Sequence, residues 1–338
     1  MSKKAFITGI TGQDGSWLAK LLVDKGYEVY GGVRRISKQN LSGLQFLGVA
    51  DKVKLMEFDL LDYSNIYTAV NTVRPDEFYN LAAQSFVGTS FAQPISTGMM
   101  DGIAVASILD ILKTFSPETK FYQASTSEMF GKVQEDIQDE NTPFYPRSPY
   151  GAAKVYAHWM TVNYRESYNM FASSGILFNH ESEMRGAEFV TRKVTLNVAK
   201  WAVGRGEVLQ IGNLNAQRDW GYAKEYVDGM WRMLQHDKPD TFVLATGKTT
   251  SIRNFITSAF QVIDIELSWH GENEAEFATN TKTGETVVKV NPDFYRPAEV
   301  ELLIGNPQKA KDLLGWEAKT DIAKLTEIMV RHDIDMLN

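Results

Sequence analysis

The chain has 338 residues, of which 43% are hydrophobic and 23% charged, with a formal net charge of −7 and no cysteine. This length and composition predict a soluble globular protein with one large domain or two closely joined ones. The acidic balance argues against a nucleic-acid-binding protein, and the lack of cysteine excludes disulfides, thiol catalysis and thiolate metal sites.

The first half alternates short apolar runs with longer amphipathic segments. The runs that predict strands are Lys4–Thr8, Glu28–Val33, Val53–Phe58, Glu77–Leu81, Lys120–Ala124 and Gly175–Phe178. The segments that predict helices are Trp17–Lys25, Asn65–Thr72, Ile103–Phe115 and Pro149–Tyr168. Repetition of strand, helix and strand is typical of an α/β protein, so we expect a Rossmann-like, doubly wound parallel sheet covered on both faces.

After about residue 180 the pattern changes. Strands are predicted at Val208–Ile211 and Phe242–Ala245, helices at Ala223–Leu234, Arg253–Ile263 and Ala323–Asp333, and loops with short strands over 271–289. No flexible linker separates the two parts. We therefore expect a dinucleotide-binding Rossmann domain with the catalytic residues over 1–180. A smaller C-terminal α/β region over 181–338 is expected to bind mainly the substrate.

A glycine-rich loop lies between the first predicted strand and the first helix. Its sequence is Gly9-Ile10-Thr11-Gly12-Gln13-Asp14-Gly15, a G-x-x-G-x-x-G pattern. A pyrophosphate can reach the backbone N–H groups of a helix N-terminus only where side chains do not block it. A plain glycine-rich turn is the alternative. The order of strand, glycine triplet, helix and second strand favours a dinucleotide-binding loop.

The residues after the second predicted strand indicate which dinucleotide is bound. An acidic residue there usually holds the ribose 2′-OH of NAD, but this chain has Arg34-Arg35. Two guanidinium groups suit a 2′-phosphate, so we expect NADP; a solvated basic loop or a subunit contact is the alternative. Residues after the third and fourth strands fit the same cofactor site: Asp59, Leu60, Leu81, Ala82, Ala83, Gln84 and Ser85.

Two further patterns carry groups that can move protons. Tyr150 and Lys154 form Y-x-x-x-K at the start of a predicted helix, where residues four apart share a face. The Lys154 ammonium would lower the pKa of the Tyr150 phenol, which could then act as a base near neutral pH. Ser125-Thr126-Ser127-Glu128 follows the fifth strand, at the sheet edge where ligands bind. A chance match and a helix-capping S-x-x-E are the alternatives, but the two patterns together favour a catalytic site.

The glycine loop, S-T-S-E and Y-x-x-x-K together resemble the extended short-chain dehydrogenase/reductase superfamily. The resemblance narrows to the GDP-mannose 4,6-dehydratase family through blocks in family order along nearly the whole chain. These blocks are Gly9–Ser16, Arg34-Arg35, Tyr122–Glu128, Pro143–Tyr150, Gly175–Ser182, Phe189–Lys193, Arg218–Gly221 and Phe294–Glu301.

This resemblance implies conversion of GDP-mannose to GDP-4-dehydro-6-deoxymannose and water, by internal hydride transfer through tightly bound NADP. Tyr150 would take the proton from sugar O4, and Lys154 would tune it and hold the nicotinamide ribose. Thr126 would hydrogen-bond near O4, and Glu128 would move protons at C5 and O6. Cofactor contacts are implied for His180 and Arg185, and substrate contacts for Ser85, Thr126, Ser127, Glu128, Asn179, Lys193, Arg218, Arg296 and Glu299. No metal is implied.

The chain departs from the family pattern at three places. Glu183-Met184-Arg185-Gly186 stands where the family has Pro-Arg-Arg-Gly, and Ser96 stands where it often has Tyr. The third is the stretch 271–289, which is shorter than in many members. We expect the first departure to affect cofactor affinity or assembly rather than the chemistry. The same dehydration of another GDP-sugar, such as a GDP-heptose, stays open. A reductase, an epimerase or a catalytically inactive NADP-binding regulator has less need of Glu128.

The resemblance also implies a homodimer through the helices around 98–115 and 149–168, or a homotetramer. The N-terminus has no apolar core of the signal-peptide kind, and no stretch reaches the roughly 20 apolar residues that span a bilayer. We therefore expect a cytoplasmic enzyme whose partners are a GDP-sugar and its own copies, with no nucleic acid and no membrane.

Overall fold

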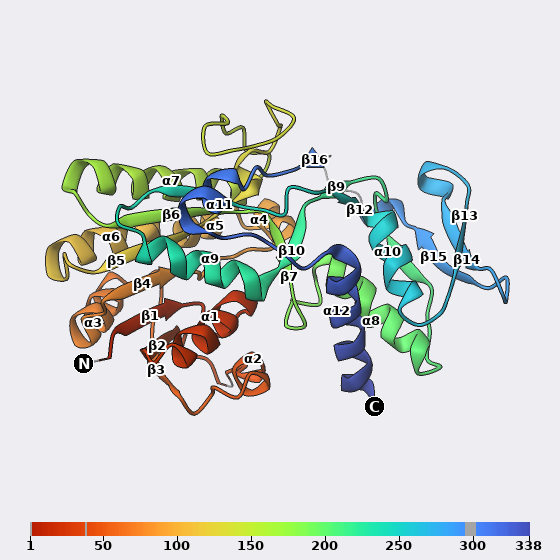
Figure 1. Ribbon diagram of the computed structural model, residues 1–338, viewed down its shortest axis with the longest axis horizontal. Helices are drawn as coiled ribbons and strands as arrows, with labels where there is room; N and C mark the ends of the chain where they lie inside the picture. Colours follow the sequence, from red (N-terminus) through yellow and green to blue (C-terminus); the bar gives the residue numbers. More distant parts are fainter. Residues whose placement is uncertain (1, 38, 295–301) are drawn as a thin grey trace.

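A parallel sheet of seven strands dominates the computed structural model, which describes residues 2–37, 39–294 and 302–338 (Figure 1). The strand order is β11-β6-β5-β4-β1-β2-β3, and every neighbouring pair is parallel. The strands are β1 (Lys4–Thr8), β2 (Glu28–Val33), β3 (Val53–Glu57), β4 (Glu77–Asn80), β5 (Lys120–Thr126), β6 (Ala172–Leu177) and β11 (Thr241–Leu244). This doubly wound order confirms the predicted fold class. It reverses beside β1, where a ligand crevice is expected outside the carboxyl ends of the strands.

The predicted strands of the first half are present, and the sixth shows the largest shift of a boundary. It begins at Ala172 rather than Gly175, because Ser173 and Ser174 are also fully buried within the sheet. Serine is not an apolar residue, so hydrophobic patterning does not extend the strand to it.

Helices cover both faces of the sheet. On one face α1 (Gln13–Asp24) packs against α9 (Ala223–Gln235); on the other, α3 (Tyr63–Val73), α6 (Ala104–Phe115) and α7 (Pro149–Tyr168) pack together. Shorter helices lie between these elements: α2 (Ser42–Phe46), α4 (Val87–Ala92), α5 (Pro94–Gly98), η2 (Ser127–Met129) and α11 (Gln308–Leu314). A π-helical turn, η1 (Met99–Ile103), joins α5 to α6 without a break.

The remaining elements form a smaller α/β region. Its helices are α8 (Val190–Ala202), α10 (Ile252–Gln261), α12 (Ile322–Leu337), η3 (Asn273–Ala275) and η4 (Pro292–Phe294). Its main sheet is β13 (Leu267–His270), β14 (Phe277–Asn280), β15 (Thr286–Val290) and β8 (Leu209–Ile211). Two short sheets pair β10 (Trp220–Tyr222) with β7 (Asn179–Glu181), and β9 (Gln217–Arg218) with β12 (Thr250–Ser251) and β16 (Leu302–Leu303).

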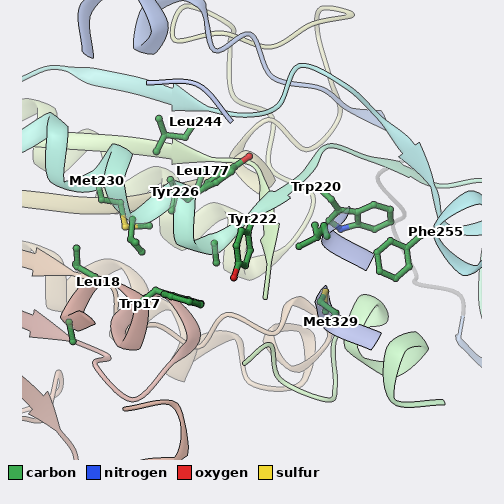
Figure 2. Packing of buried hydrophobic residues seen from close by; sticks show 14 of the residues in the cluster. Trp17, Leu18, Leu177, Trp220, Tyr222, Tyr226, Met230, Leu244, Phe255 and Met329 are labelled. Carbon is green, nitrogen blue, oxygen red and sulfur yellow. The ribbon is translucent and has the colours of Figure 1, made fainter. Parts of the chain in front are cut away.

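The chain after residue 180 contributes to both regions. Strand β11 pairs with β6 at the edge of the large sheet, and α9 packs on α1. One apolar cluster also continues from α1 through Tyr222 and Tyr226 to Phe255 and Met329 of the smaller region (Figure 2). The two regions therefore share a core, and a division at residue 180 stays a prediction.

One helical run differs from the expectation about apolar stretches. Pro94–Phe115, formed by α5, η1 and α6, is long and apolar enough to cross a membrane by length and composition, with a mean hydropathy of 1.5. Half of its most apolar window is buried inside the chain, and the run packs against α7. A helix that packs one face into a protein core passes the same test.

Candidate active site

One large cavity, of about 1020 Å³, lies at the carboxyl ends of the central strands. Residues from the glycine loop, from the ends of β4, β5 and β6, from α7 and from the smaller region line this cavity. The sequence-predicted residues that the structure brings to it are Gly9, Thr11, Gly12, Gln13, Asp14, Gly15, Arg34, Asp59, Leu60, Leu81, Ala82, Ala83, Gln84, Ser85, Thr126, Ser127, Glu128, Tyr150, Lys154, Asn179, His180, Arg185, Lys193 and Arg218.

Four of the predicted residues are not among those that line it. Ile10 is fully buried in the core beneath the sheet, because its side chain packs against Gly31. Arg35 is exposed and lies beyond the cavity lining, although Arg34 belongs to it. Arg296 and Glu299 lie outside the described residues.

The glycine loop has the shape that a dinucleotide pyrophosphate needs. Gly9 has a φ of +69°, and a Cβ at Gly15 would lie 2.2 Å from the Gly9 carbonyl oxygen. No described side chain caps the N-terminus of α1, so its first N–H groups face the cavity without such a partner. An anion at this position would accept from those groups and interact favourably with the helix dipole. The loop therefore fits the phosphates of a dinucleotide.

A partly buried ion pair holds one side of this loop. Asp14 Oδ2 lies 2.8 Å from His180 Nε2, and His180 Nδ1 lies 2.7 Å from the Phe178 carbonyl oxygen. Gln13 Nε2 donates to the His180 carbonyl at 3.0 Å, and Ser182 Oγ donates to Gln13 Oε1 at 3.0 Å. These contacts join α1 to β7, so the segment from the chain's middle holds the cofactor loop in place.

The proton-moving groups meet at the ends of β5 and α7. Ser148 caps α7 by accepting from the Gly151 N–H at 3.0 Å, and Pro149 occupies the first turn. Lys154 Nζ donates to the Ala124 carbonyl at 3.0 Å and lies 5.8 Å from the centre of the Tyr150 ring. At the end of β5, Thr126 Oγ1 accepts from the Glu128 N–H at 3.2 Å. Helix α7 and the turn after β5 thus present all four candidate catalytic side chains to one space.

The lowered pKa of Tyr150 that was expected from Lys154 is not seen in the protein alone. Burial raises the pKa of Tyr150 and the Asp101 and Glu128 carboxylates add to that rise, while a hydrogen bond with Thr126 and the Arg185 charge oppose it. The Lys154 ammonium is held by a backbone carbonyl instead of by the phenol. Tyr150 is therefore protonated at neutral pH in the protein alone.

The segment that departs from the family pattern has partners within the chain. Arg185 Nε lies 3.0 Å from Glu181 Oε2, and its guanidinium lies 3.5 Å from the centre of the Phe189 ring. Tyr222 Oη donates to Glu183 at 3.2 Å, and Met184 lies against Gly43. Glu183 and Met184 thus pack toward α2 and β10, whereas Arg185 lines the cavity.

Further from Tyr150, the cavity extends into the smaller region. Asn179 Oδ1 is buried without a hydrogen-bond partner among the described residues. Lys193 Nζ lies 3.9 Å from the centre of the Phe294 ring, and burial lowers the pKa of Lys193. Arg218 Nη1 donates to the Gln217 carbonyl at 2.9 Å. Donors and acceptors for a polar ligand are therefore present at this end as well.

Some lining residues carry no sequence signal. Phe86, Val87 and Asn213 line the cavity, but they lie in loops or at the start of the short helix α4. Asp101, close to Tyr150 and Lys154, lies in an apolar helix that predicts only core packing. The Asp14–His180 pair joins residues that are distant in the chain, so only the structure reveals it.

A doubly wound sheet, a glycine loop at the first helix and the Tyr150–Lys154 pair define an NAD(P)-dependent enzyme of the short-chain dehydrogenase/reductase superfamily. The model of one family in that superfamily, GDP-mannose 4,6 dehydratase, matches residues 6–329. The chain belongs to the GDP-mannose 4,6-dehydratase family.

Relatives support this at the level of sequence. The chain is 50% identical over 344 aligned residues to a GDP-mannose 4,6 dehydratase of Dictyostelium discoideum, covering 99% of this chain and 97% of the relative. It is 49% identical to that of Homo sapiens, covering 98% and 92%. The family resemblance predicted from the motifs is confirmed.

Solved structures share the fold at much lower identity. A UDP-glucose 4-epimerase from Thermotoga maritima has a TM-score of 0.83 at 20% identity, covering 99% of this chain and 100% of that one. A dTDP-glucose 4,6-dehydratase from Bacillus anthracis, solved with NAD, has a TM-score of 0.80 at 16% identity, covering 98% and 96%. At these identities the likeness concerns the architecture alone.

Proposed function

We propose that this chain converts GDP-mannose to GDP-4-dehydro-6-deoxymannose and water with NADP as a recycled cofactor. The observation that carries the proposal is that Thr126, Glu128, Tyr150 and Lys154 open onto the same cavity as the glycine loop. When bound, NADP would accept the hydride of C4 and return it to C6, so that the cofactor ends as it began.

The residues of the chain supply the proton transfers. Tyr150 takes the O4 proton, and Thr126, which hydrogen-bonds the phenol, also binds near O4. Oxidation at C4 acidifies the C5 proton, which Glu128 removes before it helps the C6 hydroxyl leave as water. C5 takes up a proton when the hydride returns to C6. Because burial and two carboxylates raise the pKa of Tyr150, a positive charge beside the phenol is required before it can accept a proton efficiently. Lys154 is the buried cation nearest to Tyr150 in sequence, and it lies on the same face of α7 as Tyr150.

NADP is preferred to NAD because of the loop after β2. Arg34 lines the cavity immediately after Val33, where an acidic residue would hold the 2′-OH of NAD. The glycine loop, Asp59, Leu60 and the segment 81–85 would bind the rest of the dinucleotide, with His180 and Arg185 at its edge. No described group of three or more His, Asp or Glu side chains could hold a metal.

The GDP part of the substrate would lie toward the smaller region. Asn179, Lys193 and Arg218 line that end of the cavity, and the unpartnered Asn179 Oδ1 offers an acceptor to a ligand donor. Two cationic side chains suit a diphosphate. Ser85 and Ser127 would contact the sugar; the implied contacts of Arg296 and Glu299 lie outside the described residues.

We also propose a homodimer through α5, η1 and α7. Ile95, Met99 and Ile103, four residues apart, form an apolar row, and Ile95 is 79% exposed. Tyr156 and the 55% exposed Trp159 extend this surface on α7, which packs beside the row. Burial of such a surface against a second copy would remove apolar area from water.

Incubation of the chain with NADP and GDP-mannose, without added reductant, tests the function. Mass spectrometry should detect a product lighter by one water, with no net change in NADPH absorbance. If GDP-mannose stays unchanged and another GDP-sugar gives a dehydrated product, the substrate is reassigned to that sugar. Consumption of added NADPH without loss of water would indicate a reductase and overturn the proposal.

A further inference from the structure

Asp101 is a buried carboxylate that the mechanism above leaves without a role. It is 1% exposed and lies in the π-helical turn η1. Its Oδ1 accepts from the Gln84 N–H at 2.8 Å, and its Oδ2 is buried without a partner among the described residues. A carboxylate in this state destabilises the fold unless a charge compensates for its lost hydration.

The π-helical turn brings this carboxylate to the catalytic helix. A Cβ at Gly102 would lie 3.3 Å from the Ala153 carbonyl oxygen and 3.4 Å from the Tyr156 ring, so η1 and α7 approach closely beside Lys154. Gln84, the partner of Oδ1, belongs to the cavity-lining segment after β4. Asp101 therefore lies between the cavity-lining segment after β4 and the part of the α7 backbone that carries Lys154.

Lys154 is itself buried, at 3% exposure, and makes no ion pair within 4 Å in the described part of the chain. Burial lowers the pKa of Lys154, and the charge of Asp101 opposes that fall. Burial in turn raises the pKa of Asp101 to about 6, while the Lys154 charge and the hydrogen bond from the Gln84 N–H oppose this rise. The carboxylate is therefore charged at neutral pH. The other groups facing Tyr150 are Thr126, Glu128 and Arg185.

We propose that Asp101 is a positioning residue that keeps Lys154 charged in a buried site and ties it to the cavity-lining segment after β4 through the Gln84 backbone. This inference rests on the proposed function, because it assigns Lys154 a charge that the reaction uses. Asp101 touches neither substrate nor reacting atoms and acts through Lys154.

The test compares Asp101→Asn with the wild-type chain. Asparagine has nearly the same shape and keeps an acceptor for the Gln84 N–H, so the variant removes the charge alone. Trace labelling with acetic anhydride at several pH values, read by mass spectrometry of the Lys154 peptide, gives the protonation midpoint of this amine without any turnover. We expect the midpoint to fall by about one pH unit in Asp101→Asn. Asp110→Asn on α6, an exposed carboxylate paired with Lys113, is the matched control and should shift nothing.

Turnover supplies the second readout. Because the amine loses its proton earlier, kcat of Asp101→Asn should decline at a lower pH than kcat of the wild type, with little change in KM for GDP-mannose. An unshifted midpoint in a folded Asp101→Asn protein overturns the inference, whatever its activity. If the wild type makes no dehydrated sugar, the proposed function fails, but the labelling midpoint still decides the role of Asp101. If Asp101→Asn does not fold, the double variant Asp101→Asn/Lys154→Met removes both charges. A double variant that is no more stable than Asp101→Asn also overturns the inference.

Discussion

His180 and Asp14 form an ion pair in which both imidazole nitrogens face oxygen acceptors. Nε2 lies 2.8 Å from the Asp14 carboxylate and Nδ1 lies 2.7 Å from the Phe178 carbonyl. Each nitrogen can satisfy its partner only by donating, which requires the doubly protonated ring. Burial alone would lower the pKa of His180, but Asp14 raises it overall; burial would raise the pKa of Asp14, but His180 lowers it overall.

This pair predicts a pH-dependent stability difference between the wild type and Asp14→Asn. The raised pKa of His180 contributes stability that is complete below its usual value of 6.5 and is lost as pH rises through its value in the folded protein. The lowered pKa of Asp14 contributes stability above 3.8 that is lost as pH falls. Melting temperatures should therefore favour the wild type most between these values, by a few degrees. A difference that stays constant from about pH 5 to about pH 9 would contradict the pairing.

Glu128→Gln should block elimination while it spares oxidation at C4. The amide has the same shape but cannot accept the C5 proton, and a positioned acid or base contributes about 10²–10⁴-fold to the rate. Rapid mixing with GDP-mannose should show NADPH absorbance that persists, with little dehydrated product. Product formation near the wild-type rate would remove Glu128 from the mechanism.

Tyr150→Phe should lose turnover, again by about 10²–10⁴-fold, and keep its affinity for GDP-mannose. Only the phenolic oxygen is lost, and the ring that Lys154 approaches is unchanged. Isothermal titration calorimetry with GDP-mannose measures the binding separately from the rate. If affinity fell as far as turnover, Tyr150 would be a binding residue instead.

The pair Arg34→Ala/Arg35→Ala should weaken NADP binding more than NAD binding. Hydrogen bonds to charged groups contribute about 1.5–3 kcal/mol each, so we expect a loss of at least about tenfold for NADP. Both side chains are exposed, so the loss should shrink at high salt. Titration with both dinucleotides gives the preference, and light scattering on the same sample gives the assembly. An unchanged preference with a broken assembly would make the pair an interface element.

Ile95→Glu/Ile103→Glu should convert the proposed dimer into a monomer. Two carboxylates in the centre of an apolar interface would have to be desolvated on association. Light scattering at several concentrations measures the mass, and Ile36→Glu, at another exposed isoleucine after β2, is the matched control. A wild type that is monomeric at micromolar concentration would contradict this surface assignment.

Much of the fold could be predicted because local signals and tertiary packing agree. Strands β1, β2 and β4 are short runs that are buried at most positions, and the glycine loop needs its glycines for close backbone contact. The membership of β11 in the large sheet could not be predicted, because nothing local distinguishes it from a strand of the smaller region. Its partner β6 lies far back in the chain.

The sequence predicted which residues line the site better than it predicted their pKa values. Motifs named the residues around the cavity, but the pKa of Tyr150 depends on burial and on Asp101, which no motif contains. Similarly, Arg34 and Arg35 are adjacent in sequence, yet only the first lines the cavity. Side-chain direction and neighbours distant in the chain decide these properties, and hydrophobic patterning predicts neither of them.

The place of β11 has a consequence for synthesis of the protein. Until Thr241–Leu244 leaves the ribosome, β6 has β5 on one side and an unpaired outer edge on the other. At about 5–20 residues per second, this edge stays open for several seconds after β6 has been made. Open strand edges recruit other chains, so nascent or truncated forms that end before β11 should need a chaperone more than the finished protein does.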